Sequence, residues 1–85
     1  MSTMAIEDLG RLLTEEAGET EAGALTDASA DTEFTALGYD SLALLGIAAR
    51  IAKEFGVEIP DDVLFELHTP RAVLDLVNGA VVERG

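Results

Sequence analysis

The residues most suggestive of chemistry are Asp40 and Ser41, which stand in the segment GYDSLALL (residues 38–45) at the start of an apolar run. A serine hydroxyl is a weak nucleophile unless a neighbouring base activates it, and the sequence around Ser41 offers none. A nucleophile elbow requires G-x-S-x-G after a strand, whereas this segment lacks the second glycine and follows no strand. A catalytic triad would have to recruit His68, the only histidine, which we expect in an exposed loop. Ser41 is therefore interpreted as a residue on which another enzyme acts.

The length of 85 residues predicts one small domain, spanning residues 1–85. A chain of this size buries about 60% of its surface, which supports one compact core and no deep active site. Because the chain has no cysteine, disulfides and thiolate metal sites are excluded. A single histidine also argues against a metal centre built on imidazoles. Neither a catalytic residue nor a metal site is predicted.

The charge balance is strongly acidic, with 17 acidic residues against 5 basic ones and a net charge of −12. Such a surface repels phosphate backbones and anionic lipids, so neither nucleic acid nor a membrane is an expected partner. It can steer the domain toward basic patches on other proteins, or it can serve solubility alone. No secretory signal is visible, and the uncharged run at residues 41–49 is too short to cross a bilayer. We expect a monomeric cytoplasmic protein.

The spacing of apolar residues predicts an all-α fold, a small bundle of three longer helices and one short helix. The first helix is expected at about residues 5–17, with Thr3 as the best N-cap. Residues 18–40 show little periodicity and many turn formers, but Leu25, Phe34 and Leu37 can pin this stretch across the helix ends. We interpret it as an ordered crossover that lies on the surface.

The second helix is predicted at about residues 41–55, where Gly56 provides the stop. A short helical turn is expected between Asp61 and Leu67, and Thr69 is the expected N-cap of the last helix, with Pro70 at its first position. The apolar residues expected to face the core from the second helix are Leu44, Ile47, Ala48, Ile51 and Phe55, and those from the last helix are Val73, Leu74, Val77 and Val81.

The apolar arc of the second helix is wider than one core-facing stripe needs. Leu42, Leu45 and Ala49 lie at its shoulder, next to Ser41. An exposed shoulder there would be a candidate contact for a partner, while a neighbouring helix that covers it is an equally acceptable interpretation. Gly46 costs about 1 kcal/mol relative to alanine inside a helix, and the pattern gives no reason for it beyond close approach of another part of the chain.

Three segments carry a resemblance to a known family: GYDSLALL at residues 38–45, GVEIPDDV at 56–63 and TPRAVLDLVNG at 69–79. Together and in register, they resemble acyl carrier proteins, specifically the stand-alone carriers of bacterial aromatic (type II) polyketide synthases. The resemblance covers nearly the whole chain, from IEDLGRLLTEEAG to the last helix. An aspartate-serine-leucine triplet alone would be a weak signal, but three segments at the right separations are a strong one.

The resemblance implies that a phosphopantetheinyl transferase attaches 4′-phosphopantetheine from coenzyme A to the Ser41 hydroxyl, with magnesium. The terminal thiol of this covalent cofactor then carries acyl groups as thioesters, and the carrier itself is not catalytic. Asp40 matches the motif aspartate, which is implied to help position the hydroxyl and the metal at the transferase. A phosphodiester is compatible with the start of a helix, where unpaired N–H groups and the dipole favour an anion.

The resemblance also implies roles for five further residues. Leu42, Leu45 and Ala49 match the face that partner enzymes contact in similar carriers. Arg71 and Asn78 stand where similar carriers place residues that can touch a bound polyketide; without the resemblance they would be an exposed base and a helix-ending residue.

The implied partners are the transferase, a malonyl transferase, a ketosynthase/chain-length factor pair, a ketoreductase and cyclases. A carrier for fatty-acid or starter-unit synthesis is the alternative within the class. An acidic helical interaction module that is never modified is the alternative from another class.

The chain departs from similar carriers in its second helix, which is usually acidic. Gly46 and Ile47 stand where similar chains often have glutamate and threonine, and the basic residues Arg50 and Lys53 outnumber the single acid Glu54 beyond Asp40. Docking through acids of that helix is therefore in question. The acids expected to contribute more are Asp27, Asp31, Glu33, Asp61 and Asp62.

Overall fold

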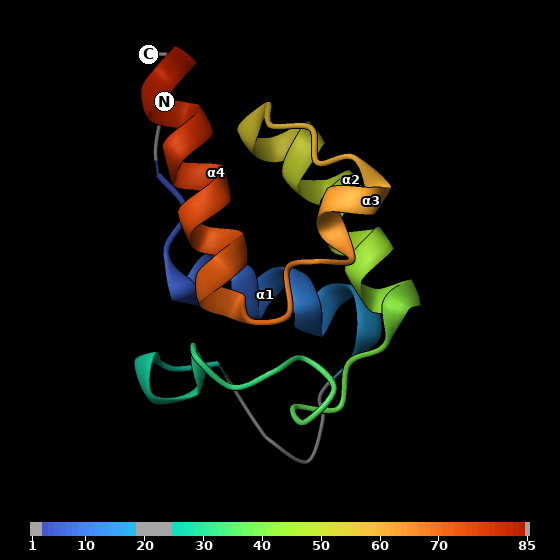
Figure 1. Ribbon diagram of the computed structural model, residues 1–85. Helices are drawn as coiled ribbons and strands as arrows, with labels where there is room; N and C mark the ends of the chain where they lie inside the picture. Colours follow the sequence, from blue (N-terminus) through green and yellow to red (C-terminus); the bar gives the residue numbers. More distant parts are fainter. Residues whose placement is uncertain (1–2, 19–24, 85) are drawn as a thin grey trace.

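The computed structural model describes residues 3–18 and 25–84, with side chains described as far as Ala80. Within these residues every regular element is helical (Figure 1). The elements are α1 (Ile6–Ala17), the 3₁₀ turn η1 (Asp27–Ser29), α2 (Ser41–Phe55), α3 (Asp61–Leu64) and α4 (Pro70–Arg84). The predicted all-α fold, with three longer helices and one short one, is thereby confirmed. The part of the expected crossover at residues 19–24 lies outside the described residues.

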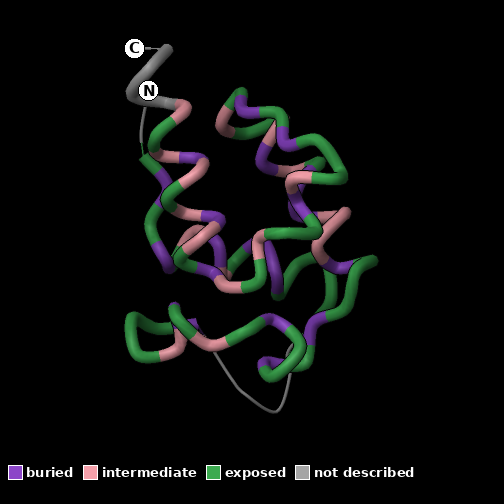
Figure 2. Tube along the Cα trace, in the orientation of Figure 1, coloured by how far each residue is buried: buried purple, intermediate pink, exposed green. Residues whose placement is uncertain are grey.

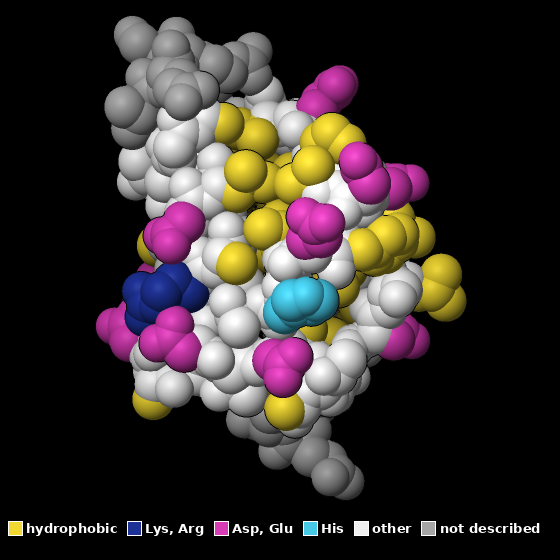
Figure 3. All heavy atoms as spheres, viewed as in Figure 1, with side chains coloured by type: hydrophobic (Ala, Val, Ile, Leu, Met, Phe, Trp, Pro, Cys, Tyr) yellow, Lys and Arg dark blue, Asp and Glu magenta, His cyan; other side chains and the backbone are white. Residues whose placement is uncertain are grey.

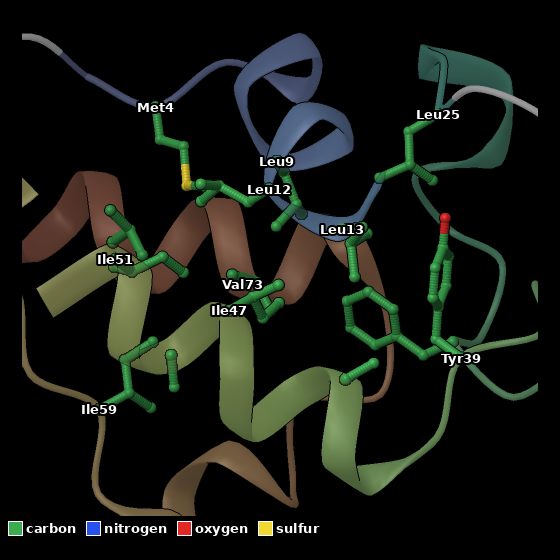
Figure 4. Packing of buried hydrophobic residues seen from close by; sticks show 14 of the residues in the cluster. Met4, Leu9, Leu12, Leu13, Leu25, Tyr39, Ile47, Ile51, Ile59 and Val73 are labelled. Carbon is green, nitrogen blue, oxygen red and sulfur yellow. The ribbon is translucent and has the colours of Figure 1, made fainter. Parts of the chain in front are cut away.

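The helices surround one apolar core. α1 packs against both α2 and α4, and α3 packs against α2. Buried positions recur on the inner side of each helix (Figure 2). Figure 4 shows Leu9, Leu12 and Leu13 of α1 directed toward Ile47 and Ile51 of α2, and each of these five side chains is fully buried. Burying one such aliphatic side chain contributes about 1.5–3 kcal/mol, so the α1–α2 contact is a main source of stability.

The crossover between Leu25 and Asp40 is ordered, as predicted, and runs along one end of the helices (Figure 1). Leu25, Phe34 and Leu37 are all buried, which confirms their role as anchors. The Phe34 ring also meets Tyr39 edge to face, with 6.4 Å between ring centroids. The crossover is therefore held by the core rather than lying free on the surface.

Two backbone hydrogen bonds tie the crossover to the start of α4 and to the residues just before it. The Phe34 N–H donates to the His68 carbonyl oxygen at 2.8 Å, and the Arg71 N–H donates to the Ala30 carbonyl oxygen at 2.9 Å. Phe34, Ala30 and His68 lie outside the α-helices, and the Arg71 N–H belongs to the first turn of α4, where an N–H has no partner within the helix. The two bonds therefore satisfy backbone groups that would otherwise lack partners. They fix the path of the chain into α2.

Two of the predicted helix ends are confirmed by the structure, and one is not. Gly56 ends α2 in the left-handed conformation (φ 70°), and the Thr69 hydroxyl oxygen accepts from the Ala72 N–H at 3.2 Å. The prediction of Thr3 as the first N-cap was wrong. α1 begins after Ala5, whose N–H donates to the Asp8 carboxylate at 2.9 Å, so a side chain within the first turn satisfies this end.

The predicted core face of α2 is confirmed in its centre. Ile47, Ala48 and Ile51 are buried, while Leu44 and Phe55 are only half-buried and pack at the edge of the core. On α4, Val73 and Val77 are fully buried, and Leu74 is half-buried. The sequence reasoning missed Ala43, which is also buried. The side chain of Val81 lies outside the described residues.

Gly46 has a neighbour in α1. A Cβ at this position would lie 2.7 Å from the Glu16 carboxylate, so the glycine leaves room for that side chain across the α1–α2 contact. Glu16 also pairs with Arg50, with 3.4 Å between the carboxylate and guanidinium atoms. The close approach expected from the sequence is therefore made by a side chain, not by another backbone.

Replacing Gly46 by alanine is expected to stabilise the protein, but by less than the same change at Gly79. Both glycines lie inside helices, where alanine is favoured by about 1 kcal/mol. A Cβ at Gly79 would meet nothing within 4 Å, whereas one at Gly46 would displace the flexible Glu16 side chain and weaken an exposed ion pair. Urea unfolding followed by circular dichroism measures the free energy of unfolding of the wild type and of both variants. A Gly46→Ala variant less stable than the wild type would contradict this account.

Candidate functional site

Ser41 occupies the first residue of α2, and Asp40 caps the helix. The Asp40 carboxylate accepts a hydrogen bond from the Ala43 N–H at 3.0 Å, and its backbone is extended, as is usual at this position. The Asp40 carbonyl oxygen accepts from the Leu44 N–H at 3.2 Å. Because the cap fixes where the helix starts, the Ser41 side chain is presented at the helix end, where it is exposed to solvent.

The start of α2 suits a covalently bound anion. The first N–H groups of a helix have no partner within the helix. Within the described part of the chain no group accepts from the N–H of Ser41 or of Leu42. These donors and the positive end of the helix dipole favour negative charge at this end. A phosphodiester on the Ser41 oxygen therefore fits the residues that surround it.

A pocket of about 620 Å³ opens beside Ser41. Its walls are the end of the crossover, the start of α2 and the chain that follows α3. The lining residues include Phe34, Tyr39, Asp40, Ser41, Leu44, Phe65, Leu67 and His68. The hydroxyl thus stands at the edge of a mostly apolar space, which is large enough for part of a flexible arm attached to it.

The predicted shoulder of α2 is largely on the surface. Leu42 is 76% exposed, Ala49 is exposed and Leu45 is half-buried. Leu45 and Ala49 also line a groove of about 500 Å³. Its other wall is formed by the segment that leads into α3, including Pro60, and by Asp61 at the start of α3. The described helices thus leave this surface without a cover, and the open alternative of a neighbouring helix over it does not hold for Leu42 or Ala49.

Arg50, one of the two cations of α2, is directed toward α1. Arg50 pairs with Glu15 and Glu16 of α1 and with Glu54 one turn further along α2. Arg11 of α1 also reaches Glu54, at 3.0 Å. The hydrogen bond from Arg11 lowers the pKa of the Glu54 carboxyl below its usual value, so this acid stays ionised to lower pH. The single acid of α2 beyond Asp40 is therefore engaged in an ion-pair cluster and not directed to the surface around Ser41.

Arg71 and Asn78 both have partners within the fold. The Arg71 Nε donates to the Asp31 carboxylate at 2.7 Å, which adds to the ties between crossover and α4. The Asn78 amide accepts from the Met4 N–H at 2.7 Å and donates to the Met4 carbonyl oxygen at 3.0 Å. The structure therefore places Arg71 at the crossover and Asn78 against residue 4, and neither lines the pocket beside Ser41.

Phe65 is a surface residue that the sequence reasoning missed. It follows α3, is 45% exposed and lines the pocket beside Ser41. Its apolar character resembled that of the core residues nearby, so periodicity alone gave no sign of its position. His68 is exposed, as expected, and lines the same pocket.

Two features are absent from the described residues. Over residues 3–18 and 25–84, no group of histidine, cysteine, aspartate and glutamate side chains is arranged to hold a metal ion. No helix in this described portion is long and apolar enough to cross a membrane.

Known proteins resemble this chain over most of its length. The family model described as "Phosphopantetheine attachment site" matches residues 8–77. The actinorhodin polyketide synthase acyl carrier protein of Streptomyces coelicolor is 49% identical, over 94% of this chain and 93% of its own. The oxytetracycline polyketide synthase acyl carrier protein of Streptomyces rimosus is 42% identical, over 95% of this chain and 85% of its own.

Solved structures of similar carrier proteins have the same fold as this chain. The holo form of the actinorhodin acyl carrier protein from S. coelicolor superimposes with a TM-score of 0.85 at 46% identity, covering 99% of this chain and 98% of its own. Its octanoyl form gives a TM-score of 0.87 with the same identity and coverage. The four helices and the exposed Ser41 at the start of α2 are compatible with a carrier domain. The chain belongs to the acyl carrier proteins, and its relatives are the carriers of type II polyketide synthases.

Asp40→Ala is expected to lower the free energy of unfolding by about 1 kcal/mol, because it removes the side-chain cap of α2. Asp40→Asn should retain nearly all of the stability, since asparagine caps a helix about as well as aspartate. Thr69→Ala removes the corresponding cap of α4 and serves as the matched control. Urea unfolding of the wild type and the three variants measures these free energies. Equal stabilities of the two Asp40 variants would show that the cap does not fix the start of α2.

Proposed function

We propose that Ser41 carries 4′-phosphopantetheine, whose thiol holds malonyl and growing polyketide chains as thioesters in the synthesis of an aromatic polyketide. The observation that carries this proposal is the exposed Ser41 hydroxyl at the first residue of α2, in a chain whose family is defined by phosphopantetheine attachment. The uncovered N–H groups of the first turn and the adjoining pocket support it. As an acyl carrier protein the chain is a substrate of other enzymes and not itself a catalyst.

Asp40 is proposed to have a second role beside capping. Asp40 precedes Ser41 in the chain and lines the same pocket, and its carboxylate accepts only one hydrogen bond within the described residues, from Ala43. A carboxylate has capacity for several further interactions. We therefore assign Asp40 to positioning the hydroxyl and the magnesium ion when the phosphopantetheinyl transferase binds.

The chain works with the enzymes of a polyketide synthase. The specific partners we propose are a phosphopantetheinyl transferase, a malonyl transferase, a ketosynthase/chain-length factor pair, a ketoreductase and cyclases. Leu42, Leu45 and Ala49 form the proposed contact surface, and the exposure of Leu42 and Ala49 supports it. We further propose one carrier domain over residues 1–85, acting as a monomer in the cytoplasm.

We propose Arg71 and Asn78 as contacts for bound cargo. Each would first have to release its hydrogen-bond partner within the fold. Arg71 would have to leave Asp31, which is feasible because both side chains are at least half exposed and such a pair contributes little. Asn78 would have to release both backbone groups of Met4. Of the two residues, Arg71 is the one more readily available to cargo.

Incubation with coenzyme A, magnesium and a broad-specificity transferase should add the mass of one phosphopantetheine to the wild-type chain. Ser41→Ala should gain nothing, and Ser29→Ala, which removes another serine hydroxyl, should gain as much as the wild type. Intact-protein mass spectrometry gives the readout. An unmodified wild type would favour an interaction module that is never modified, and a gain that survives Ser41→Ala would contradict attachment at Ser41.

Leu45→Glu should reduce turnover by a ketosynthase pair by at least roughly tenfold, since it puts a charge in the middle of the proposed contact surface. Leu45 is only half-buried, so circular dichroism should show an intact fold. Phosphopantetheine loading measured on the same sample serves as the control for a competent Ser41. Unchanged turnover would show that this part of α2 does not contact the enzyme.

A further inference from the structure

His68 is the one basic side chain, among the described residues, that lines the pocket beside Ser41. Both residues line this space of about 620 Å³, and none of the other lining residues is a lysine or an arginine. His68 is exposed, and over the described part of the chain no hydrogen bond or ion pair holds its imidazole. The ring is therefore available to a group that is attached to Ser41.

The backbone of His68 is fixed close to the start of α2. The Phe34 N–H donates to the His68 carbonyl oxygen at 2.8 Å, and the Tyr39 N–H donates to the Phe34 carbonyl oxygen at 2.9 Å. These successive hydrogen bonds join His68 to the residues that immediately precede Ser41. On its other side, the Thr69 side chain caps α4. The imidazole is therefore attached at a defined point beside the pocket.

The other charged groups in the pocket are acids. Glu33 and Asp40 line it, and Glu66 is exposed in the chain just before His68. Figure 3 shows the histidine at the surface, with acidic side chains above and below it in this view. A phosphodiester on Ser41 brings a further negative charge into this space, and like charges repel each other. The start of α2 offsets part of this repulsion, and a cation in the pocket would offset more.

The other cations with described side chains are engaged or lie elsewhere. Three arginines form ion pairs with carboxylates, namely Arg11, Arg50 and Arg71. Lys53 lies in the last turn of α2, at the opposite end of the helix from the pocket. Among the described side chains, His68 is therefore the cation that suits a phosphodiester at the start of α2.

We propose that the protonated imidazole of His68 binds the phosphodiester of the arm attached to Ser41. The inference rests on the proposed function, because the anion is part of that arm. A protonated imidazole donates from both ring nitrogens, and a hydrogen bond between two charged groups is stronger than a neutral one. The contact holds the first segment of the arm over the pocket, where the arm would otherwise rotate about its bonds to the serine.

The contact depends on pH, since a histidine side chain changes charge between about pH 5 and 8. The phosphodiester stabilises the protonated ring, so the contact forms as the pH falls and is lost as the pH rises. The titratable and charged groups around the ring come from the crossover, the start of α2, the chain after α3 and α4: Glu33, Tyr39, Asp40, Glu66 and Arg71. They are present in the loaded and the unloaded chain alike. A difference between these two chains therefore reports the arm.

The test uses the wild type and His68→Gln, each prepared without a histidine tag and loaded with phosphopantetheine from coenzyme A. Mass spectrometry verifies loading, and circular dichroism verifies the fold. Because His68 is the only histidine, proton NMR follows its ring signals over the pH range without ambiguity. Phosphorus NMR follows the phosphodiester, which does not itself titrate near neutral pH. Failure of the wild type to load would contradict the proposed function, and this step separates that result from a failure of the contact.

Loading is expected to raise the pH at which the His68 ring signals titrate by roughly half a unit at low salt, and by less at high salt, because an exposed ion pair is weak and screened. The phosphorus signal of the loaded wild type should move over the same pH range and should stay constant in His68→Gln. An unchanged titration of His68 on loading would overturn the proposal. A phosphorus signal that moves equally in His68→Gln would do the same.

A histidine placed outside the pocket provides the matched control. Asp75→His on the His68→Gln background puts a single histidine at an exposed position of α4 that does not line the pocket. Its titration should be the same before and after loading. A shift as large as that of His68 would show that the arm acts through the overall charge of the molecule, and would contradict a contact at His68.

Discussion

The position of Ser41 depends on how the crossover is attached to the start of α4 and to the residues just before it. The hydrogen bonds from the Phe34 N–H to His68 and from the Arg71 N–H to Ala30 join segments more than thirty residues apart, and the burial of Phe34 fixes the crossover to the core. The chain therefore enters α2 at a defined point, where the Asp40 cap begins the helix. The same ties hold the walls of the pocket together, since Phe34 and His68 both line it.

The distribution of charge follows from the packing of α1 on α2. Because Arg50 and Glu54 are directed into the ion-pair cluster with α1, the outward face of α2 retains apolar and small side chains near Ser41. Acids on the crossover and α3 surround this face. The domain thus presents an apolar surface within a strongly acidic molecule, whose net charge is −12.

Local sequence signals predicted much of the fold. Gly56, Thr69 and the spacing of Ile47 and Ile51 determine helix ends and faces through interactions within a few residues, so they could be interpreted without a structure. Contacts between distant segments could not be predicted from the sequence in this way. The Glu16 side chain over Gly46, the Asn78 amide on Met4 and the exposure of Phe65 all depend on how the helices pack. Within the site, Asp40 and Ser41 were evident from their types and order, whereas the pocket beside them was not.

We propose that this carrier holds its cargo through an arm on Ser41. Proteolysis of the loaded chain after arginine yields a peptide from residues 12–50 that contains Ser41 together with several other hydroxyl groups. Fragmentation of that peptide in the mass spectrometer assigns the modification to a single residue. The account predicts that the phosphopantetheine mass lies on Ser41 alone. Its assignment to any other residue, or a peptide that is unmodified after treatment with coenzyme A and a transferase, would contradict the account.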